Sequence, residues 1–432
     1  MSLARPRALD RRALLQGALG LGSTVMLTGL PVRLAAGRPL DAIRSQVAER
    51  LAQLVAGDGE PLRAVPGAAL AILRDGDVIL AETAGEARLA THAGHAALPL
   101  TPTTALRVAS ISKLATALTA MRVAEQGLID LDADLSGWLG FELRHPAWPG
   151  APITARQLLA HSSSLRDPPV YWMPAPGEIA GLVTPEVFTP ARPGTAFEYC
   201  NLGYGLVATA LEVATGSRFD LLAHELVLRP LGLGDCGFNW SGVPEARRAG
   251  AGTLYRRDED GRWQAQVDAP GAVPAAGAPV FLAEPGFELA AYRPGSNGTL
   301  FSPQGGLRAG LIDIARLARA FARGGPGEAL TDPVGPSRLA GASSADIWGT
   351  GPQLLAADAH ADGHGPDLIG HAGQALGFFG GAWTTADGRD TVAYFVTGHD
   401  PRAGLERDPA TGFTSWESVL LSVAMATVRA LG

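Results

Sequence analysis

Lysine is almost absent from this chain of 432 residues: of its 35 lysine and arginine residues, only Lys113 is a lysine. An arginine side chain keeps its proton in proteins, whereas a partly desolvated lysine can lose it near neutral pH and act as a base. Almost all of the positive charge therefore sits on groups that cannot serve as a base. The one amine that can do so is a candidate for chemistry.

Other scarcities exclude whole classes of protein. The net charge is −7 and no run of basic residues forms a stripe, so the sequence predicts no nucleic-acid partner. The only two cysteines, Cys200 and Cys236, could pair in an oxidising compartment but do not predict a disulfide framework. No internal repeat is present, which excludes solenoids and propellers. With 47% hydrophobic residues, the chain can bury a large core.

The first 37 residues have the order of an export signal. Arg11 and Arg12 precede an apolar stretch over 13–32, and small residues follow at 35–37. The arginine pair is similar to that of a twin-arginine signal, so we expect a periplasmic or secreted protein whose only membrane contact is this segment. A retained anchor is the alternative, because about 20 apolar residues can span a bilayer. Polar residues and glycines within the stretch favour cleavage. A membrane-tethered structural protein would rest on this segment alone.

Apolar periodicity and turn residues predict helices and strands at both ends of the remaining chain. Apolar residues at helical spacing alternate with polar ones in the helices, and short runs of β-branched residues flank the turns of the hairpins. The expected helices cover 40–55, 114–125, 312–323 and 413–431, and the expected strands cover 65–73, 78–83, 378–383 and 391–396.

The middle of the chain, from about 130 to 311, shows mostly helical patterns broken by proline-rich loops. The longest loops are 167–194 and 270–298. Long ordered loops in a chain of this size tend to line a functional site. We therefore expect one or both of them at the site.

The single lysine stands three residues after a serine, in Ser110-Ile111-Ser112-Lys113. Serine favours the start of a helix, and a spacing of three places both side chains on one helix face. A neutral amine in that position can take the proton of the hydroxyl as its oxygen attacks a carbonyl. The N-terminal end of the helix would also stabilise negative charge that develops there.

With this motif the sequence resembles the serine β-lactamase and penicillin-recognising family, in its class C-like branch. The family's further motifs have counterparts in the same order, and the resemblance runs from about residue 40 to the C-terminus. The counterparts are Tyr199-Cys200-Asn201, Gly370-His371-Ala372-Gly373, and the flanking stretches 158–165, 230–233 and 302–307.

The resemblance implies an α/β (α+β) fold, with an antiparallel sheet flanked by helices and a mostly helical second subdomain. The sheet subdomain would combine about 38–109 with 312–432, and the helical one would span about 110–311. Ser110 would then be the nucleophile, and Lys113 and Tyr199 would move protons. No cofactor or metal is implied.

The resemblance also implies a set of substrate-binding residues. Asn201 would donate to a substrate carbonyl and hold the lysine in place. Main-chain N–H groups of Ser110 and Gln374 would form the oxyanion hole, and His371 and Gly373 would contact the substrate. These roles imply a small-molecule or peptide substrate.

Two departures from the family pattern bear on the substrate and the local structure. His371 stands where many β-lactamases carry a lysine, and imidazole is mostly neutral at pH 7. This argues against penicillin hydrolysis and for esters, small amides or D-amino-acid peptides. Ser164 stands where glycine is frequent, which we expect to alter a turn. His161, in the same stretch, is interpreted as a structural histidine bonded to a loop carbonyl.

His360 and His364 could suggest a metal site, but they lack the spacing of a zinc site.

Two functional alternatives stay open. The chain could keep the fold and bind cell-wall peptides without turnover, like a penicillin sensor, and acyl transfer to an acceptor other than water is another outcome of the same chemistry.

Overall fold

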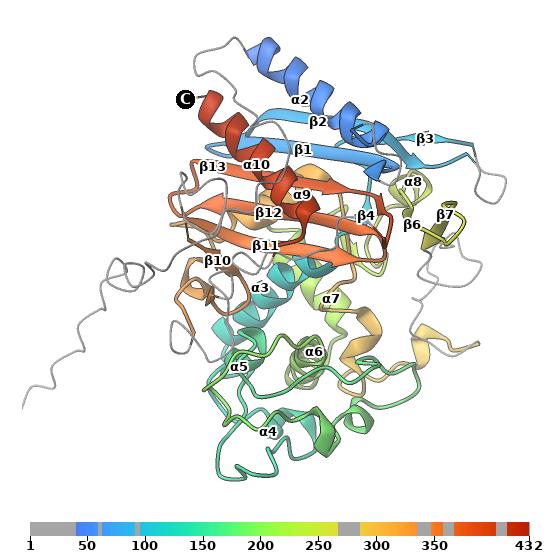
Figure 1. Ribbon diagram of the computed structural model, residues 1–432. Coiled ribbons are helices and arrows are strands. Elements are labelled where there is room, and N and C mark those ends of the chain that lie inside the picture. Colours follow the sequence, from blue (N-terminus) through green and yellow to red (C-terminus); the bar gives the residue numbers. More distant parts are fainter. Residues whose placement is uncertain are drawn as a thin grey trace, which may run out of the picture.

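A large antiparallel sheet forms the centre of the computed structural model, which describes residues 40–58, 63–90, 96–266, 286–334, 347–356, 367–402 and 413–431. Eight strands are ordered β3-β2-β1-β13-β12-β11-β10-β9 (Figure 1). Their bounds are Leu98–Pro99, Asp77–Arg88, Gly67–Arg74, Asp390–Val396, Phe378–Thr385, Leu368–Ala375, Gln353–Leu355 and Ile347–Trp348. The proposed export segment, His360 and His364 lie outside the described residues.

Both faces of the sheet are covered by helices. Along β1, Ala68, Leu70 and Ile72 pack into one apolar cluster and the alternate residues into another, as expected for a strand buried on both faces. The first cluster includes α2 (Leu40–Ala56) and α10 (Ser415–Ala430), and the second includes α9 (Leu311–Arg319) and α3 (Ser112–Glu125). The predicted antiparallel sheet flanked by helices is confirmed.

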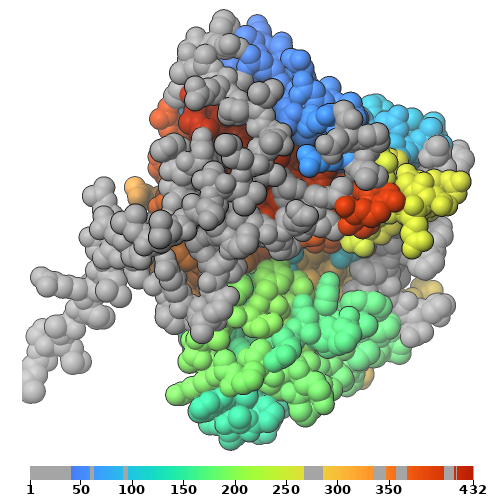
Figure 2. All heavy atoms as spheres, viewed as in Figure 1, coloured from blue at the N-terminus to red at the C-terminus, as the bar shows by residue number. Residues whose placement is uncertain are grey.

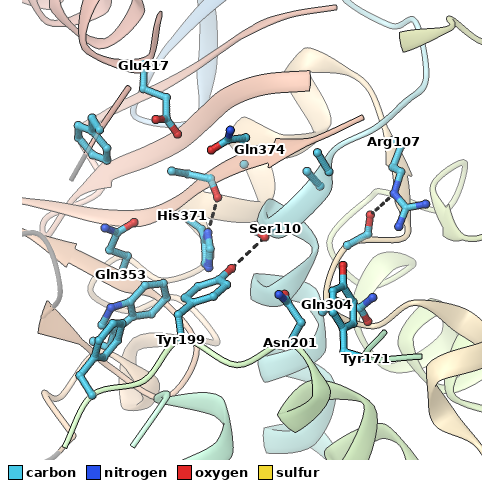
Figure 3. Close-up of a pocket in the computed structure, with 18 residues that line it drawn as sticks. Arg107, Ser110, Tyr171, Tyr199, Asn201, Gln304, Gln353, His371, Gln374 and Glu417 are labelled. Atoms are coloured by element: carbon cyan, nitrogen blue, oxygen red, sulfur yellow. Dashed lines mark hydrogen bonds between the residues drawn. The ribbon is translucent and has the colours of Figure 1, made fainter. Parts of the chain in front are cut away.

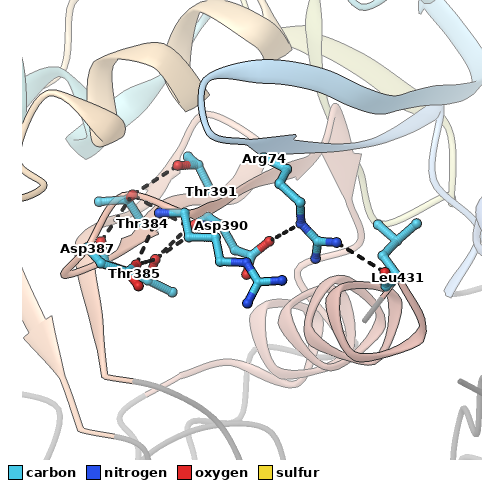
Figure 4. Close-up of polar contacts among 8 residues, drawn as sticks. Arg74, Thr384, Thr385, Asp387, Asp390, Thr391 and Leu431 are labelled. Carbon is cyan, nitrogen blue, oxygen red and sulfur yellow. Dashed lines mark hydrogen bonds and ion pairs between the residues drawn. The ribbon is translucent and has the colours of Figure 1, made fainter.

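The two ends of the described chain meet in this sheet, where β1 pairs with β13. Arg74 joins them to the closing helix: its Nε atom donates to Asp390 at 2.9 Å, and its Nη1 atom donates to the carbonyl of Leu431 at 3.1 Å (Figure 4). A cation at the C-terminal end of α10 also interacts favourably with the helix dipole. The sheet therefore depends on segments that are more than 300 residues apart in sequence.

The middle of the chain forms a second, mainly helical part around α6, which packs against α3. It lies below the sheet in Figure 1 and forms the green lower part of the face in Figure 2. The remaining α-helices are α4 (Ser136–Leu139), α5 (Ala155–Leu159), α6 (Leu202–Thr215), α7 (Phe219–Ala223) and α8 (Glu245–Ala249), and a π-helix covers His224–Leu228. None of the helices in the described ranges is long and apolar enough to cross a membrane.

Short strands that periodicity does not predict join the two parts. They form two three-stranded sheets, β14-β6-β7 and β4-β8-β5. Strands of two to four residues are too short to show an alternating pattern, and their pairing depends on tertiary contacts. Their bounds are Gly398–His399, Leu254–Arg257 and Trp263–Gln266 in the first, and Leu106–Arg107, Leu307–Ala309 and Gly237–Phe238 in the second. Both cysteines are free and buried.

Candidate active site

Ser110 lies in a short 3-10 turn, η2 (Ala109–Ile111), that leads directly into α3. The α-helix itself begins at Ser112, two residues before the predicted range 114–125 and two residues after Ser110. The turn and the helix still bring the predicted pair together, because Nζ of Lys113 lies 3.1 Å from Oγ of Ser110. The spacing of three residues therefore has the geometric consequence that the sequence indicates.

The backbone just before the serine is held in an uncommon conformation. Ala109 has a φ of 49°, in the left-handed region that residues with a side chain seldom adopt. Oγ of Ser112 donates to the carbonyl of Ala109 at 2.6 Å and accepts from the N–H of Leu307 at 3.0 Å. These bonds hold the turn that presents Ser110 to the pocket.

Lys113 is fully buried beneath the serine. Besides Ser110, its Nζ atom donates to Oδ1 of Asn201 at 2.7 Å and to the carbonyl of Gln304 at 2.9 Å. Burial lowers the pKa of Lys113 to about 7, and the negative charge of Asp167 opposes that shift. The amine can therefore exchange a proton near neutral pH.

Tyr199, three residues before α6, also contacts Oγ of Ser110. Its hydroxyl donates to Oγ of Ser110 at 2.9 Å, and Nζ of Lys113 lies 4.9 Å from the centre of its ring. His161 stacks on the tyrosine ring at 4.2 Å between ring centres. The serine oxygen is thus shared by an amine and a phenol.

Asp167, which the sequence analysis did not single out, organises the start of α6. Its carboxylate accepts from the main-chain N–H of Asn201 at 2.6 Å, from the side-chain amide of Asn201 at 2.8 Å, and from the N–H of Leu202 at 2.9 Å. An anion at the N-terminus of a helix is favourable. The available signal was its place at the start of the long 167–194 loop.

His161 has a structural role, but not through the predicted carbonyl contact. Its Nδ1 atom accepts from the N–H of Cys200 at 3.1 Å, and its own carbonyl accepts from the N–H of Glu198 at 2.8 Å. Burial, with a contribution from Lys113, lowers the pKa of His161 well below its ordinary value. A neutral His161 therefore holds the segment that carries Tyr199.

Ser164, which stands where glycine is frequent, lies in a turn with an uncommon backbone conformation. Ser164 has a φ of 66°, so the serine adopts the left-handed conformation that favours glycine, and its carbonyl accepts from the N–H of Thr189 at 2.8 Å. Its buried hydroxyl lacks a hydrogen-bond partner.

Gly373 and Gln374 lie on β11, which passes close to η2. A Cβ atom on Gly373 would stand 2.9 Å from the carbonyl oxygen of Val108, so only glycine allows this approach. The two-residue turn at Leu376 and Gly377 closes the β11–β12 hairpin with the pair Ala375–Phe378. Antiparallel alternation then places the N–H of Gln374 on the side of β11 away from β12, which is the side of the pocket.

His371 also lies on β11, but without the charge of a lysine. Its Nδ1 atom donates to the carbonyl of Ala372, and burial, followed by the influence of Lys113, lowers the pKa of His371 to about 3. The imidazole is therefore neutral at pH 7. The structure agrees with the absence of a permanent cation at this position.

These residues surround one pocket of about 400 Å³ (Figure 3). Every predicted site residue lines it except Lys113, which lies beneath Ser110. The loop 167–194 reaches the pocket through Tyr171, as expected of a long loop. The lining residues are Arg107, Ala109, Ser110, Tyr171, Phe197, Tyr199, Asn201, Gln304, Gly305, Trp348, Gln353, His371–Ala375, Phe413 and Glu417.

Two charged side chains among these were not predicted. Arg107 donates to the carbonyl of Gly305 at 2.9 Å and to Oγ of Ser302 at 3.0 Å. Glu417 accepts from the N–H of Thr414 at 2.7 Å at the start of α10. Figure 3 shows them on opposite sides of Ser110. Their location at the pocket depends on tertiary packing, and no local sequence pattern predicts it.

No group of three or more histidine, cysteine or acidic side chains able to hold a metal ion occurs among the residues that the structure describes.

Comparison with known proteins gives both sequence relatives and a shared fold. A family model described as Beta-lactamase matches residues 47–413. The D-alanyl-D-alanine-carboxypeptidase/endopeptidase AmpH of Escherichia coli (strain K12) is 32% identical over 139 residues, which are 30% of this chain and 36% of AmpH. A D-aminopeptidase of Brucella anthropi is 30% identical over 184 residues, which are 39% of this chain and 32% of the enzyme. The chain thus aligns with about a third of either relative.

Among solved structures, the D-amino acid amidase from Ochrobactrum anthropi SV3 complexed with L-phenylalanine amide matches with a TM-score of 0.62. The match covers 90% of this chain and 98% of the amidase, at 18% sequence identity. At that identity the similarity shows a common fold.

Proposed function

Because the chain belongs to the beta-lactamase family, we propose that it is a serine hydrolase that cleaves its substrate through an acyl-enzyme on Ser110. One observation carries this proposal. Oγ of Ser110, at the wall of a pocket, lies 3.1 Å from Nζ of Lys113 and 2.9 Å from the hydroxyl of Tyr199. A nucleophile beside groups that can accept and donate its proton is what acyl transfer requires.

In the acylation step, Oγ of Ser110 forms a bond to the substrate carbonyl carbon while its proton moves to the neutral Nζ of Lys113. Main-chain N–H groups of Ser110 and Gln374 stabilise the charge on the carbonyl oxygen. As the bond to the leaving group breaks, Tyr199 gives that group its hydroxyl proton. The acyl-enzyme then stands beside a protonated lysine and a phenolate, whose opposite charges stabilise each other.

Deacylation restores both groups. A water oxygen attacks the acyl carbon and its proton moves to the phenolate of Tyr199, while Oγ of Ser110 leaves with the proton held by Lys113. Asn201 keeps the lysine in place through its Oδ1 atom, and the amide hydrogen that does not face Asp167 is available to a substrate carbonyl.

The substrate class follows from the charge at His371. A neutral imidazole cannot hold a substrate carboxylate as a lysine would, so esters, small amides and D-amino-acid peptides are the proposed substrates rather than penicillins. The names of AmpH, a carboxypeptidase/endopeptidase, and of the D-aminopeptidase support amide bonds next to D-residues.

We place this activity outside the cytoplasm, on the basis of Arg11, Arg12 and the apolar stretch that follows them. Mass spectrometry of the exported protein tests the proposal. A mature chain that begins near residue 37 is expected, and one that begins at Met1 or Ser2 would contradict cleavage.

The nucleophile is tested with a fluorophosphonate probe and with p-nitrophenyl acetate. Ser110→Ala should abolish both labelling and turnover. Ser45→Ala is the matched control, because Ser45 is exposed on α2 and does not line the pocket, and it should keep the labelling. Undiminished labelling of Ser110→Ala would refute the assignment. If Ser110 takes the acetyl group from p-nitrophenyl acetate and never releases it, the result would instead favour a binding protein without turnover.

A further inference from the structure

Two polar atoms of the pocket wall lack hydrogen-bond partners. Among the described residues, several buried side-chain nitrogen and oxygen atoms are unpartnered, and those that belong to residues lining the pocket are Nε2 of His371 and Nε1 of Trp348. His371 is 2% exposed and Trp348 is 5% exposed. Leaving a buried polar group without a partner is unfavourable, so such a pair indicates a ligand that completes it.

Whether Nε2 of His371 donates or accepts a hydrogen bond is decided by the contact that Nδ1 of the same ring makes. Nδ1 contacts the carbonyl oxygen of Ala372, and a carbonyl can only accept, so Nδ1 carries the hydrogen. The neutral ring then presents Nε2 as a bare acceptor. Figure 3 shows the ring of His371 directed toward Tyr199 and Ser110.

Trp348 supplies the opposite polarity beside it. Indole Nε1–H is a donor only. The two residues lie near each other in the sheet, because β10 pairs both with β9, which carries Trp348, and with β11, which carries His371. Their ring centres are 5.0 Å apart with a T-shaped orientation, so the two rings form one continuous part of the pocket wall.

We propose that His371 and Trp348 form a subsite for a neutral carboxamide group of the substrate, whose N–H bonds to His371 and whose oxygen bonds to Trp348. This inference rests on the proposed function and makes its substrate class narrower. A carboxylate offers only acceptors, so one of its oxygens would face the lone pair of His371. The subsite therefore selects a primary carboxamide, whose oxygen and one N–H lie on the same side, and rejects a free carboxyl terminus.

The experiment uses benzamide and benzoate. The two compounds have the same shape, but one carries a carboxamide and the other a carboxylate where the subsite would bind. Each is titrated into the full chain while the indole N–H signal of Trp348 is followed by ¹⁵N–¹H NMR. Loss of that signal in Trp348→Phe assigns it. The indole of Trp138, which donates to the carbonyl of Leu128 away from the pocket, is the internal control.

Benzamide is expected to shift the Trp348 signal with an affinity at least about tenfold above that of benzoate, the factor expected for one hydrogen bond gained or opposed. His371→Lys should reverse the preference, because an ammonium donates to a carboxylate. Trp348→Phe keeps the ring but removes the donor. In that variant benzamide should inhibit p-nitrophenyl acetate turnover several times less well.

Equal affinities for the two compounds in both the native chain and His371→Lys would overturn the proposal, as would the absence of a Trp348 shift with either compound. The NMR readout does not need catalysis. If the native chain failed to turn over esters but kept the benzamide preference, the hydrolase proposal would fail and the subsite would stand.

Discussion

The carboxylate of Asp167 holds Asn201 at two points, accepting from its main-chain N–H at 2.6 Å and from its side-chain amide at 2.8 Å. The second contact orients the amide so that Oδ1 faces Nζ of Lys113 at 2.7 Å. Asp167 does not line the pocket, yet its charge raises the pKa of the lysine against the effect of burial. It is therefore a positioning residue with an electrostatic influence on the base.

Asp167→Asn is expected to change the pH profile as well as the rate. Removing the negative charge lowers the pKa of Lys113 further, so the acidic limb of kcat/KM should move to lower pH. The maximal rate should fall because Asn201 loses its orientation, and the free energy of unfolding should drop by about 1–3 kcal/mol. Stopped assays from about pH 5 to 9 and urea unfolding measure the two effects.

Asp260→Asn serves as the control, because Asp260 is exposed and pairs with Arg262 far from the pocket. It should leave both the pH profile and the stability unchanged. A purely structural Asp167 would lower stability without moving the acidic limb.

Lys113 should impose its own titration on the native enzyme. The amine accepts the serine proton only when it is neutral, and neutral amine predominates above its pKa of about 7. The value of kcat/KM for p-nitrophenyl acetate should therefore rise with pH through about 7. Lys113→Arg keeps the charge but cannot take the proton, and should lose about 100-fold or more in kcat. A flat profile, or an active arginine variant, would contradict the role of the base.

Gly373→Ala tests the close approach of β11 to the nucleophile. The added Cβ would meet the carbonyl of Val108 at 2.9 Å and a side-chain carbon of Ile111 at 3.2 Å, so the strand must move away from η2. Misplacing the oxyanion donor on that strand should reduce kcat by about 100-fold. Gly137→Ala, where an added Cβ meets nothing within 4 Å, should retain the native rate. Steady-state kinetics of both variants decide the matter.

Ser164→Gly is expected to stabilise the protein. Glycine relieves a left-handed φ of 66°, worth about 1–2 kcal/mol, and removes a buried hydroxyl without a partner, while it adds about 0.5–1 kcal/mol of chain entropy to the unfolded state. The free energy of unfolding should rise by about 1 kcal/mol, seen as a higher Tm. Ser163→Gly, which removes an acceptor for the N–H of Leu165, should lower it. A lower Tm for Ser164→Gly would show that the turn is not strained.

Local features of the fold could be predicted because covalent spacing determines them. Ile43, Val47, Leu51 and Leu54 recur at helical spacing, and all four are buried on one side of α2. The hairpins around Gly76 and Gly388 follow from turn residues between short apolar runs. Periodicity could not reveal the strands of two to four residues, which form only because a partner lies beside them.

The amino-acid sequence by itself placed the single lysine three residues after Ser110, and one turn of backbone is enough to bring amine and hydroxyl within 3.1 Å. Only the tertiary structure brought Tyr199, Asp167 and Trp348 to the same place, since they come from segments whose separation along the chain says nothing about distance. It also decided the chemistry of the amine. The pKa of Lys113 depends on the burial and charges around it, and those exist only once the sheet and the helices have packed together.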